Sequence, residues 1–93
     1  MFTSLLRRLR HKIREGQYVM PLHAEEEMDG DNLTIFDVEN SFLTGRIARR
    51  QRDPRTREWK YLVTGRTIQG GRAAAVAKLS PTDALVSITV YAD

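Results

Sequence analysis

The order of two hydrophobic patterns along the chain limits its possible folds more than any other feature. Apolar residues follow helical spacing up to about residue 45, and they alternate with polar residues from residue 46 onward. Strands joined by short connections must be antiparallel. We therefore predict an α+β fold, with N-terminal helices packed on one face of a four-stranded, mainly antiparallel sheet. Three turn signals separate the four strands: Pro54-Arg55, Gly70-Gly71 and Pro81-Thr82-Asp83.

The predicted elements form one domain over residues 1–93, because a chain of 93 residues buries only one modest core. Residues 1–16 form an amphipathic helix, and residues 17–45 form a short strand and two helices. The second of these two helices begins at a capping box in which Thr34 and Asp37 bond reciprocally. Residues 46–93 form the antiparallel meander.

Alternation assigns the side chains of the last strand to two faces of the sheet. One set is predicted to face the helices, and it consists of Val86, Ile88 and Val90. The other set is predicted to face outward, and it consists of Ser87, Thr89 and Tyr91. Lys78 is predicted to share this outer face, where a shallow site or an ordinary solvated polar surface are both compatible with the sequence.

Several classes of protein are excluded by residues that the chain lacks. It has no cysteine and two histidines, so we expect neither a disulfide framework nor a structural metal site. No glycine pattern typical of a nucleotide-binding loop occurs, so no cofactor is expected. No apolar run approaches the roughly 18 residues of a membrane span. We expect a cytoplasmic protein that does not bind membranes.

Charge is concentrated in blocks. Residues 25–39 contain acidic side chains and no lysine or arginine, whereas residues 46–60 are strongly basic. We interpret the basic block as a hairpin that contacts RNA phosphates, with aromatic side chains that stack on bases. The alternative is a solvated edge hairpin whose charges prevent aggregation. The predicted RNA-binding residues are Arg46, Arg49, Arg50, Arg52, Trp59 and Tyr61.

His23 is the better placed of the two histidines for chemistry, because His11 lies among basic residues of the first helix. An imidazole with a pKa near 6.5 suits general acid or base catalysis. A histidine at a helix start that bonds only to backbone is the alternative, since no partner is visible in the sequence.

Four segments, taken in order, resemble a known family. They read YVMPLHAEEEM at 18–28, LTIFDVENSFLTG at 33–45, YLVTGRT at 61–67 and ITVY at 88–91. Together they resemble domain-of-unknown-function family 4258. A basic amphipathic N-terminal segment is also typical of a mitochondrial transit peptide. The resemblance covers nearly the whole chain from the first helix onward and argues against that interpretation.

The resemblance implies a RelE/ParE-like fold and a bacterial toxin similar to MqsR. Such toxins are metal-independent endoribonucleases that cleave messenger RNA, in some cases on the ribosome. The implied partner is an antitoxin, such as a zinc-finger protein of the YgiT/MqsA type. By matching position, His23 would act as acid or base, Lys60 or Lys78 would stabilise the phosphorane, and Tyr91 would orient the phosphate or the base.

Two alternatives to an enzyme stay open at this point. A non-catalytic module with the same fold would bind nucleic acid or an antitoxin. Glu27 favours it, because many members of the family that the chain resembles have an arginine just before the helix methionine. In the other alternative, the stripe of Leu5, Leu9 and Ile13 pairs with a second copy of the chain.

Overall fold

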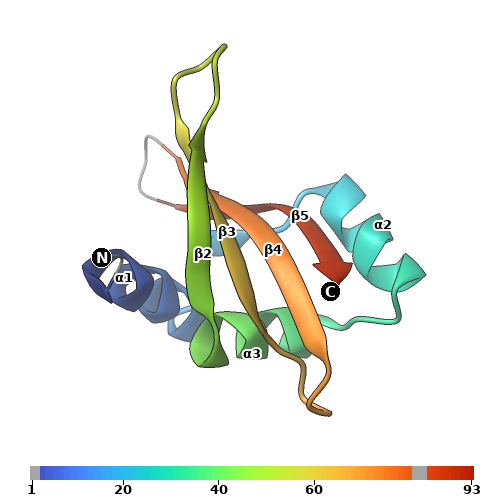
Figure 1. Ribbon diagram of the computed structural model, residues 1–93. Helices are drawn as coiled ribbons and strands as arrows, with labels where there is room; N and C mark the ends of the chain where they lie inside the picture. The colour runs from blue at the N-terminus through green and yellow to red at the C-terminus, as the bar shows by residue number, and fades with distance from the viewer. Residues whose placement is uncertain (1–2, 81–83) are drawn as a thin grey trace.

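The computed structural model describes residues 3–80 and 84–93. It contains the predicted helices, the predicted short strand and a meander, and the short strand joins the sheet (Figure 1). The helices are α1 (Thr3–Arg14), α2 (Leu22–Gly30) and α3 (Ile35–Thr44). The strands are β1 (Tyr18–Val19), β2 (Arg46–Arg52), β3 (Trp59–Arg66), β4 (Arg72–Leu79) and β5 (Leu85–Ala92). The third predicted turn, at residues 81–83, lies outside the described residues.

The prediction of four strands is wrong, because the sheet has five, in the order β1-β5-β4-β3-β2. The extra strand is the short segment before Pro21. Its residues Tyr18 and Val19 pair in parallel with Leu85 and Val86, whereas all other pairings are antiparallel. A two-residue strand gives no alternation signal, so only the tertiary fold reveals its partner.

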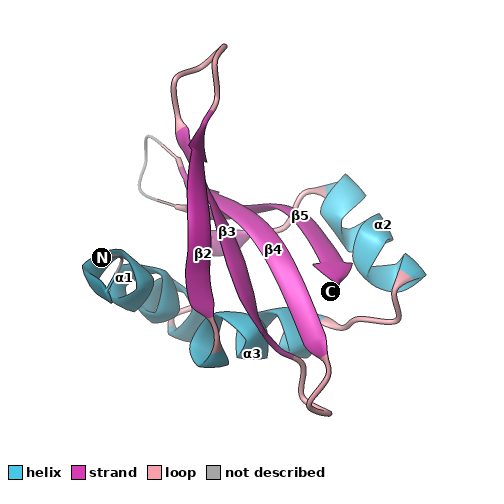
Figure 2. Ribbon diagram, in the orientation of Figure 1, coloured by secondary structure: helices cyan, strands magenta, loops and turns pink. Residues whose placement is uncertain are grey.

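The helices cover one face of the sheet, which we call the helix-covered face (Figure 2). Phe42 and Leu9 are fully buried and pack with Val63 and Val90 in a single core. Leu9 and Ile13 of the α1 stripe lie inside this core, and Leu5 packs against it. The stripe is therefore used within the chain and is not available to pair with a second copy.

Small residues let α3 lie close to the sheet. Ala73, Ala75 and Ala77 of β4 are buried on the helix-covered face. A Cβ atom built on Gly65 of β3 would overlap the backbone carbonyl group of Ser41. Glycine at this position is thus a packing requirement and not a turn signal.

The capping box predicted at the start of α3 is confirmed. The Thr34 hydroxyl accepts the Asp37 N–H, and the Asp37 carboxylate accepts the Thr34 N–H. The second Asp37 oxygen accepts the N–H of Ile68 at 2.9 Å, so this carboxylate also fixes the β3–β4 turn. These backbone hydrogen bonds lower the pKa of Asp37.

A bulge in β5 overturns part of the predicted facing. Val76 pairs with Thr89, but Ala77 pairs with Ser87, so Ile88 is an extra residue. Ser87 therefore lies on the helix-covered face, where it is 2% exposed. Val86 lies on the opposite face, which we call the open face, together with Thr89 and Tyr91. Lys78 pairs with Val86, which confirms that it shares the face of Thr89 and Tyr91.

Candidate nucleic-acid interface

Strand β2 is an edge of the sheet, and the β2–β3 hairpin projects beyond the helices (Figure 1). A second bulge distributes its arginines over both faces. Ile47 pairs with Val63 and Arg49 pairs with Leu62, so Ala48 is the extra residue. Arg49 therefore lies on the open face, and Arg50 lies on the other face, opposite Tyr61.

The arginines of the hairpin differ from Lys60 and Lys78, which form ion pairs. Within the described part of the chain, the recorded ion pairs involve Lys60, Arg72 and Lys78 and none of the hairpin arginines. All of these arginines are exposed. They therefore keep their full positive charge toward solvent, and they are Arg46, Arg49, Arg50, Arg52, Arg55 and Arg57.

Trp59 lies at the base of the hairpin loop, within reach of two of these cations. The guanidinium carbon of Arg50 lies 4.3 Å from the centre of the Trp59 ring, and that of Arg52 lies 5.1 Å away. Both distances are typical of cation–π contacts. Trp59 is half-buried and remains at the molecular surface, whereas Tyr61 packs against the core. Both predicted stacking residues are partly exposed, and Trp59 is the one with cations over its ring.

The two lysines of the open face are already paired. Lys60 Nζ lies 3.1 Å from Asp53 Oδ2, and Lys78 Nζ lies 3.0 Å from Glu58 Oε2. Asp53 also accepts the N–H of Arg55 at 2.8 Å. This backbone hydrogen bond and the Lys60 ammonium lower the pKa of Asp53. The hairpin loop thus brings its carboxylates to the lysines and, among the described residues, leaves its arginines without a carboxylate partner.

Three of the four candidate catalytic residues share one face of the sheet. Lys60, Lys78 and Tyr91 lie on the open face, where Lys60 and Tyr91 line a small hollow of about 80 Å³ with Arg49. His23 does not join them. It is an exposed residue in the first turn of α2, and that helix packs with Ala24 and Met28 into the core of the helix-covered face.

No site for a metal or a membrane accompanies these residues. The described part of the chain contains no grouping of three or more histidine, aspartate and glutamate side chains suited to a metal ion. Within residues 3–80 and 84–93, no helix has both the length and the apolarity to cross a bilayer.

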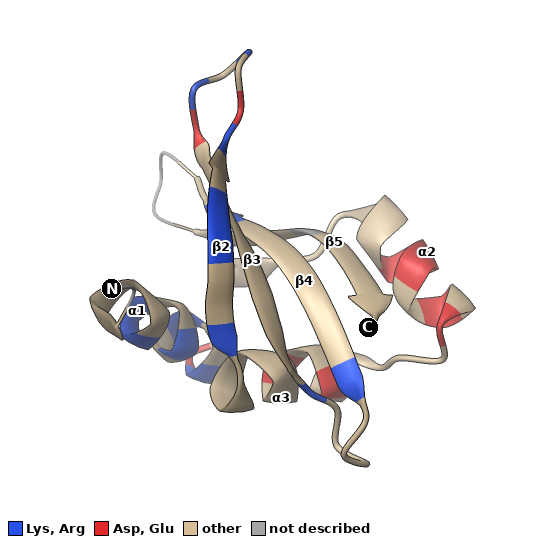
Figure 3. Ribbon diagram, in the orientation of Figure 1, with Lys and Arg blue, Asp and Glu red and all other residues tan. Residues whose placement is uncertain are grey.

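Charges of opposite sign lie at opposite ends of the sheet (Figure 3). Basic residues follow α1 and β2 up to the tip of the hairpin, and acidic residues cover α2 beside β5. The charge blocks of the sequence predict the basic hairpin, whereas no site was expected on α1. The signal was the spacing of Arg7, Arg10 and Arg14, which places them on one side of a helix.

Comparison with known proteins gives one family. A family model described as "Domain of unknown function (DUF4258)" matches residues 22–92, which include every element from α2 to β5. Searches of curated proteins and of solved structures give no significant match. The matched range covers most of the chain and excludes α1 and β1. The chain therefore belongs to the domain-of-unknown-function family DUF4258.

Proposed function

We propose that this protein binds single-stranded RNA in the cytoplasm through the β2–β3 hairpin. The observation that carries the proposal is the row of exposed arginines from Arg46 to Arg57, none of which has a carboxylate partner among the described residues. Unpaired cations along an edge strand attract a polyanion, and release of condensed counterions then favours binding.

Trp59 favours a single strand over a duplex. Bases of a single strand are free to stack on an aromatic ring, whereas those of a duplex are already stacked. Arg50 and Arg52 hold the Trp59 ring in place and add positive charge beside it. A phosphate bound by these arginines would bring its base within reach of the indole.

Charge removal on β2 tests this proposal. The variant with Arg49→Gln, Arg50→Gln and Arg52→Gln is expected to bind a labelled RNA oligonucleotide on the order of 10- to 100-fold more weakly at 100 mM salt. Arg72→Gln is the control, because Arg72 lies at the end of β4 that is away from the hairpin loop. Its guanidinium is paired with Asp93 at 3.1 Å. Equal losses in both proteins would contradict the assignment to β2.

The domain is further proposed to be a RelE/ParE-like toxin whose antitoxin covers the basic hairpin. The α+β architecture and the unpaired arginines support this relationship. An acidic antitoxin segment would compete with RNA for the same arginines. Co-expression with a candidate antitoxin is expected to relieve growth arrest and to abolish RNA binding by the purified complex.

RNA cleavage is a second candidate function, and the shared open face of Lys60, Lys78 and Tyr91 favours it. The ribose 2′-oxygen would attack the adjacent phosphorus and the P–O5′ bond would break, which leaves a 2′,3′-cyclic phosphate and a 5′-hydroxyl. Incubation with end-labelled RNA in EDTA tests this reaction. Cutting that is lost with Lys78→Ala would support cleavage. Intact RNA would contradict it and leave RNA binding as the proposed function. His23→Ala tests whether the remote histidine takes part.

A further inference from the structure

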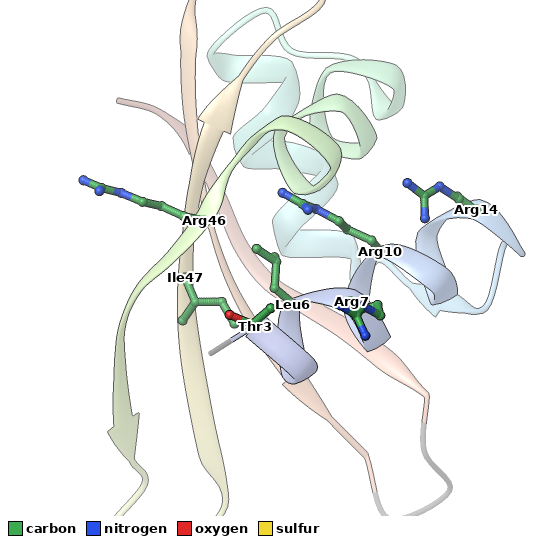
Figure 4. Close-up of a pocket in the computed structure, with 7 residues that line it drawn as sticks. All are labelled: Thr3, Leu6, Arg7, Arg10, Arg14, Arg46 and Ile47. Atoms are coloured by element: carbon green, nitrogen blue, oxygen red, sulfur yellow. The ribbon is translucent and has the colours of Figure 1, made fainter. Parts of the chain in front are cut away.

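A cleft of about 480 Å³ separates α1 from the start of β2, and arginines dominate its lining (Figure 4). Arg7, Arg10 and Arg14 come from one side of α1, and Arg46 comes from β2. The remaining lining residues are Thr3, Leu6 and Ile47, so no carboxylate lines the cleft.

Ion pairs among the described residues do not explain why these arginines lie together. Among the described residues, Arg7, Arg14 and Arg46 have no recorded hydrogen bond or ion pair. Like charges three or four residues apart on a helix repel one another. A helix C-terminus favours cations in its last turn, which accounts for Arg14 but not for Arg7. An anionic ligand would account for both.

Arg10 differs from the others, because its position is fixed. Its Nε donates to the Phe42 carbonyl at 3.0 Å, and its Nη2 donates to the Gly45 carbonyl at 2.8 Å. Arg10 thus caps the C-terminal end of α3 and joins α1 to the loop that leads into β2. A guanidinium has five N–H donors, so three remain for a ligand.

The guanidinium groups do not converge on one point, and the Arg46 side chain points away from α1 (Figure 4). Figure 4 shows those of Arg46, Arg10 and Arg14 well separated from one another. A single small phosphate would need several donors around one position. Separated cations suit an extended chain of phosphates, and Arg46 is also the first residue of the hairpin row.

We propose that this cleft binds phosphate groups of the RNA strand that the hairpin holds, so that α1 and β2 form one continuous track. The inference rests on the proposed RNA binding and adds to it a contact surface from α1, which lies outside the residues matched by the family model. The cleft binds the backbone and reads no sequence, because arginine contacts to phosphate are independent of the base.

The test measures RNA affinity as a function of salt for the full chain. For single strands, the slope of log K against log salt changes by about 0.7 for each phosphate contact. The double variant Arg7→Gln/Arg14→Gln is expected to reduce the slope by about 1.4. Arg8→Gln is the matched control, since Arg8 lies on the same helix but does not line the cleft. Its slope is expected to stay near that of the unmodified protein.

Each outcome has a distinct meaning. RNA binding with an unchanged slope in the double variant would overturn the cleft and leave the hairpin proposal standing. A reduction of about 0.7 in Arg8→Gln, half that of the double variant, would also overturn it, because the slope would then follow total charge and not the cleft. Absence of RNA binding by the unmodified protein would overturn both proposals. Thermal unfolding separates binding from folding, because a cooperative transition near the melting temperature of the unmodified protein shows that the double variant is folded.

Discussion

The Lys78 ammonium group lies 3.0 Å from the Glu58 carboxylate, and this ion pair joins the middle strands of the sheet to the loop of the β2–β3 hairpin. The same Glu58 oxygen has no solvent-accessible surface, so Lys78 is its main electrostatic partner among the described residues. Asp53 pairs with Lys60 in the same way, at 3.1 Å. The hairpin thus neutralises the open-face lysines and presents its arginines to solvent.

Removal of the Glu58 charge is expected to strengthen RNA binding. Glu58→Gln releases the Lys78 ammonium and removes a negative charge beside the arginine row, so affinity is expected to rise about 3- to 10-fold at 100 mM salt. Fluorescence anisotropy with labelled RNA measures the change. Glu26→Gln makes the same charge change on exposed α2 and is the control. If both variants bind equally more tightly, the effect comes from net charge and not from the ion pair.

Gly65→Ala is expected to destabilise the fold by about 1–3 kcal/mol, as overpacking does. The added methyl group would overlap the Ser41 carbonyl group, and backbone atoms of α3 cannot move aside as a flexible side chain can. Gly30→Ala is the control, because open space surrounds Gly30 at the end of α2. Urea unfolding of both variants gives the comparison. Equal stability of the two would show that α3 is not held tightly against β3.

Alkaline pH is expected to unfold the protein through Tyr18. Burial and a hydrogen bond to the Glu39 carboxylate raise the pKa of Tyr18 from 10.0 to about 12. The unfolded chain therefore loses this proton at a lower pH than the folded protein does. The stabilisation is complete below pH 10 and is lost as the pH rises from 10 to about 12.

Tyr18→Phe tests this relationship between β1 and α3. The variant lacks the hydroxyl and is expected to show a shallower loss of stability between pH 10 and 12. At neutral pH it is expected to be less stable by about 1.5–3 kcal/mol, because the lost hydrogen bond joins a hydroxyl to a charged group. An alkaline unfolding curve identical to that of the unmodified protein would assign the transition to other groups.

Acid is expected to weaken the start of α3. The N–H groups of Thr34 and Ile68 lower the pKa of Asp37, so its stabilisation is present above the ordinary carboxyl pKa of 3.8 and is lost as the pH falls through the lowered value. Asp37→Ala is expected to cost about 1–2 kcal/mol at neutral pH. Thermal melting measures the loss, and Asp29→Ala on exposed α2 serves as the comparison. A smaller loss for Asp37→Ala than for Asp29→Ala would contradict the role in capping.

Much of the fold could be predicted because local patterns agree with tertiary packing. The Leu9 and Ile13 stripe and the Thr34 capping box are local signals, and both are present as predicted. The parallel pairing of β1 is different, since it depends on a contact between Tyr18 and Leu85 that no local pattern encodes.

The β-bulges mark the limit of prediction for the site. Uninterrupted alternation from Ile47 would put Arg50 and Arg52 on the open face. The extra residue Ala48 moves them to the helix-covered face, where Trp59 also lies. The bulge at Ile88 moves Val86 to the open face in the same way. A bulge reverses the facing of the side chains on one side of it relative to those on the other, and neither bulge residue is a glycine that would reveal it. The ion pairs of Lys60 and Lys78 depend on the conformation of the hairpin loop, so they could not be predicted from the sequence either.

The salt dependence of RNA affinity tests the central claim most directly. A labelled single-stranded oligonucleotide is titrated with the unmodified protein at several potassium chloride concentrations between about 50 and 300 mM. If at least four arginines of the hairpin contact phosphates, log K is expected to fall against log salt with a slope of about −3 or steeper. Absence of binding at 50 mM, or an affinity that does not change with salt, would contradict an RNA-binding hairpin.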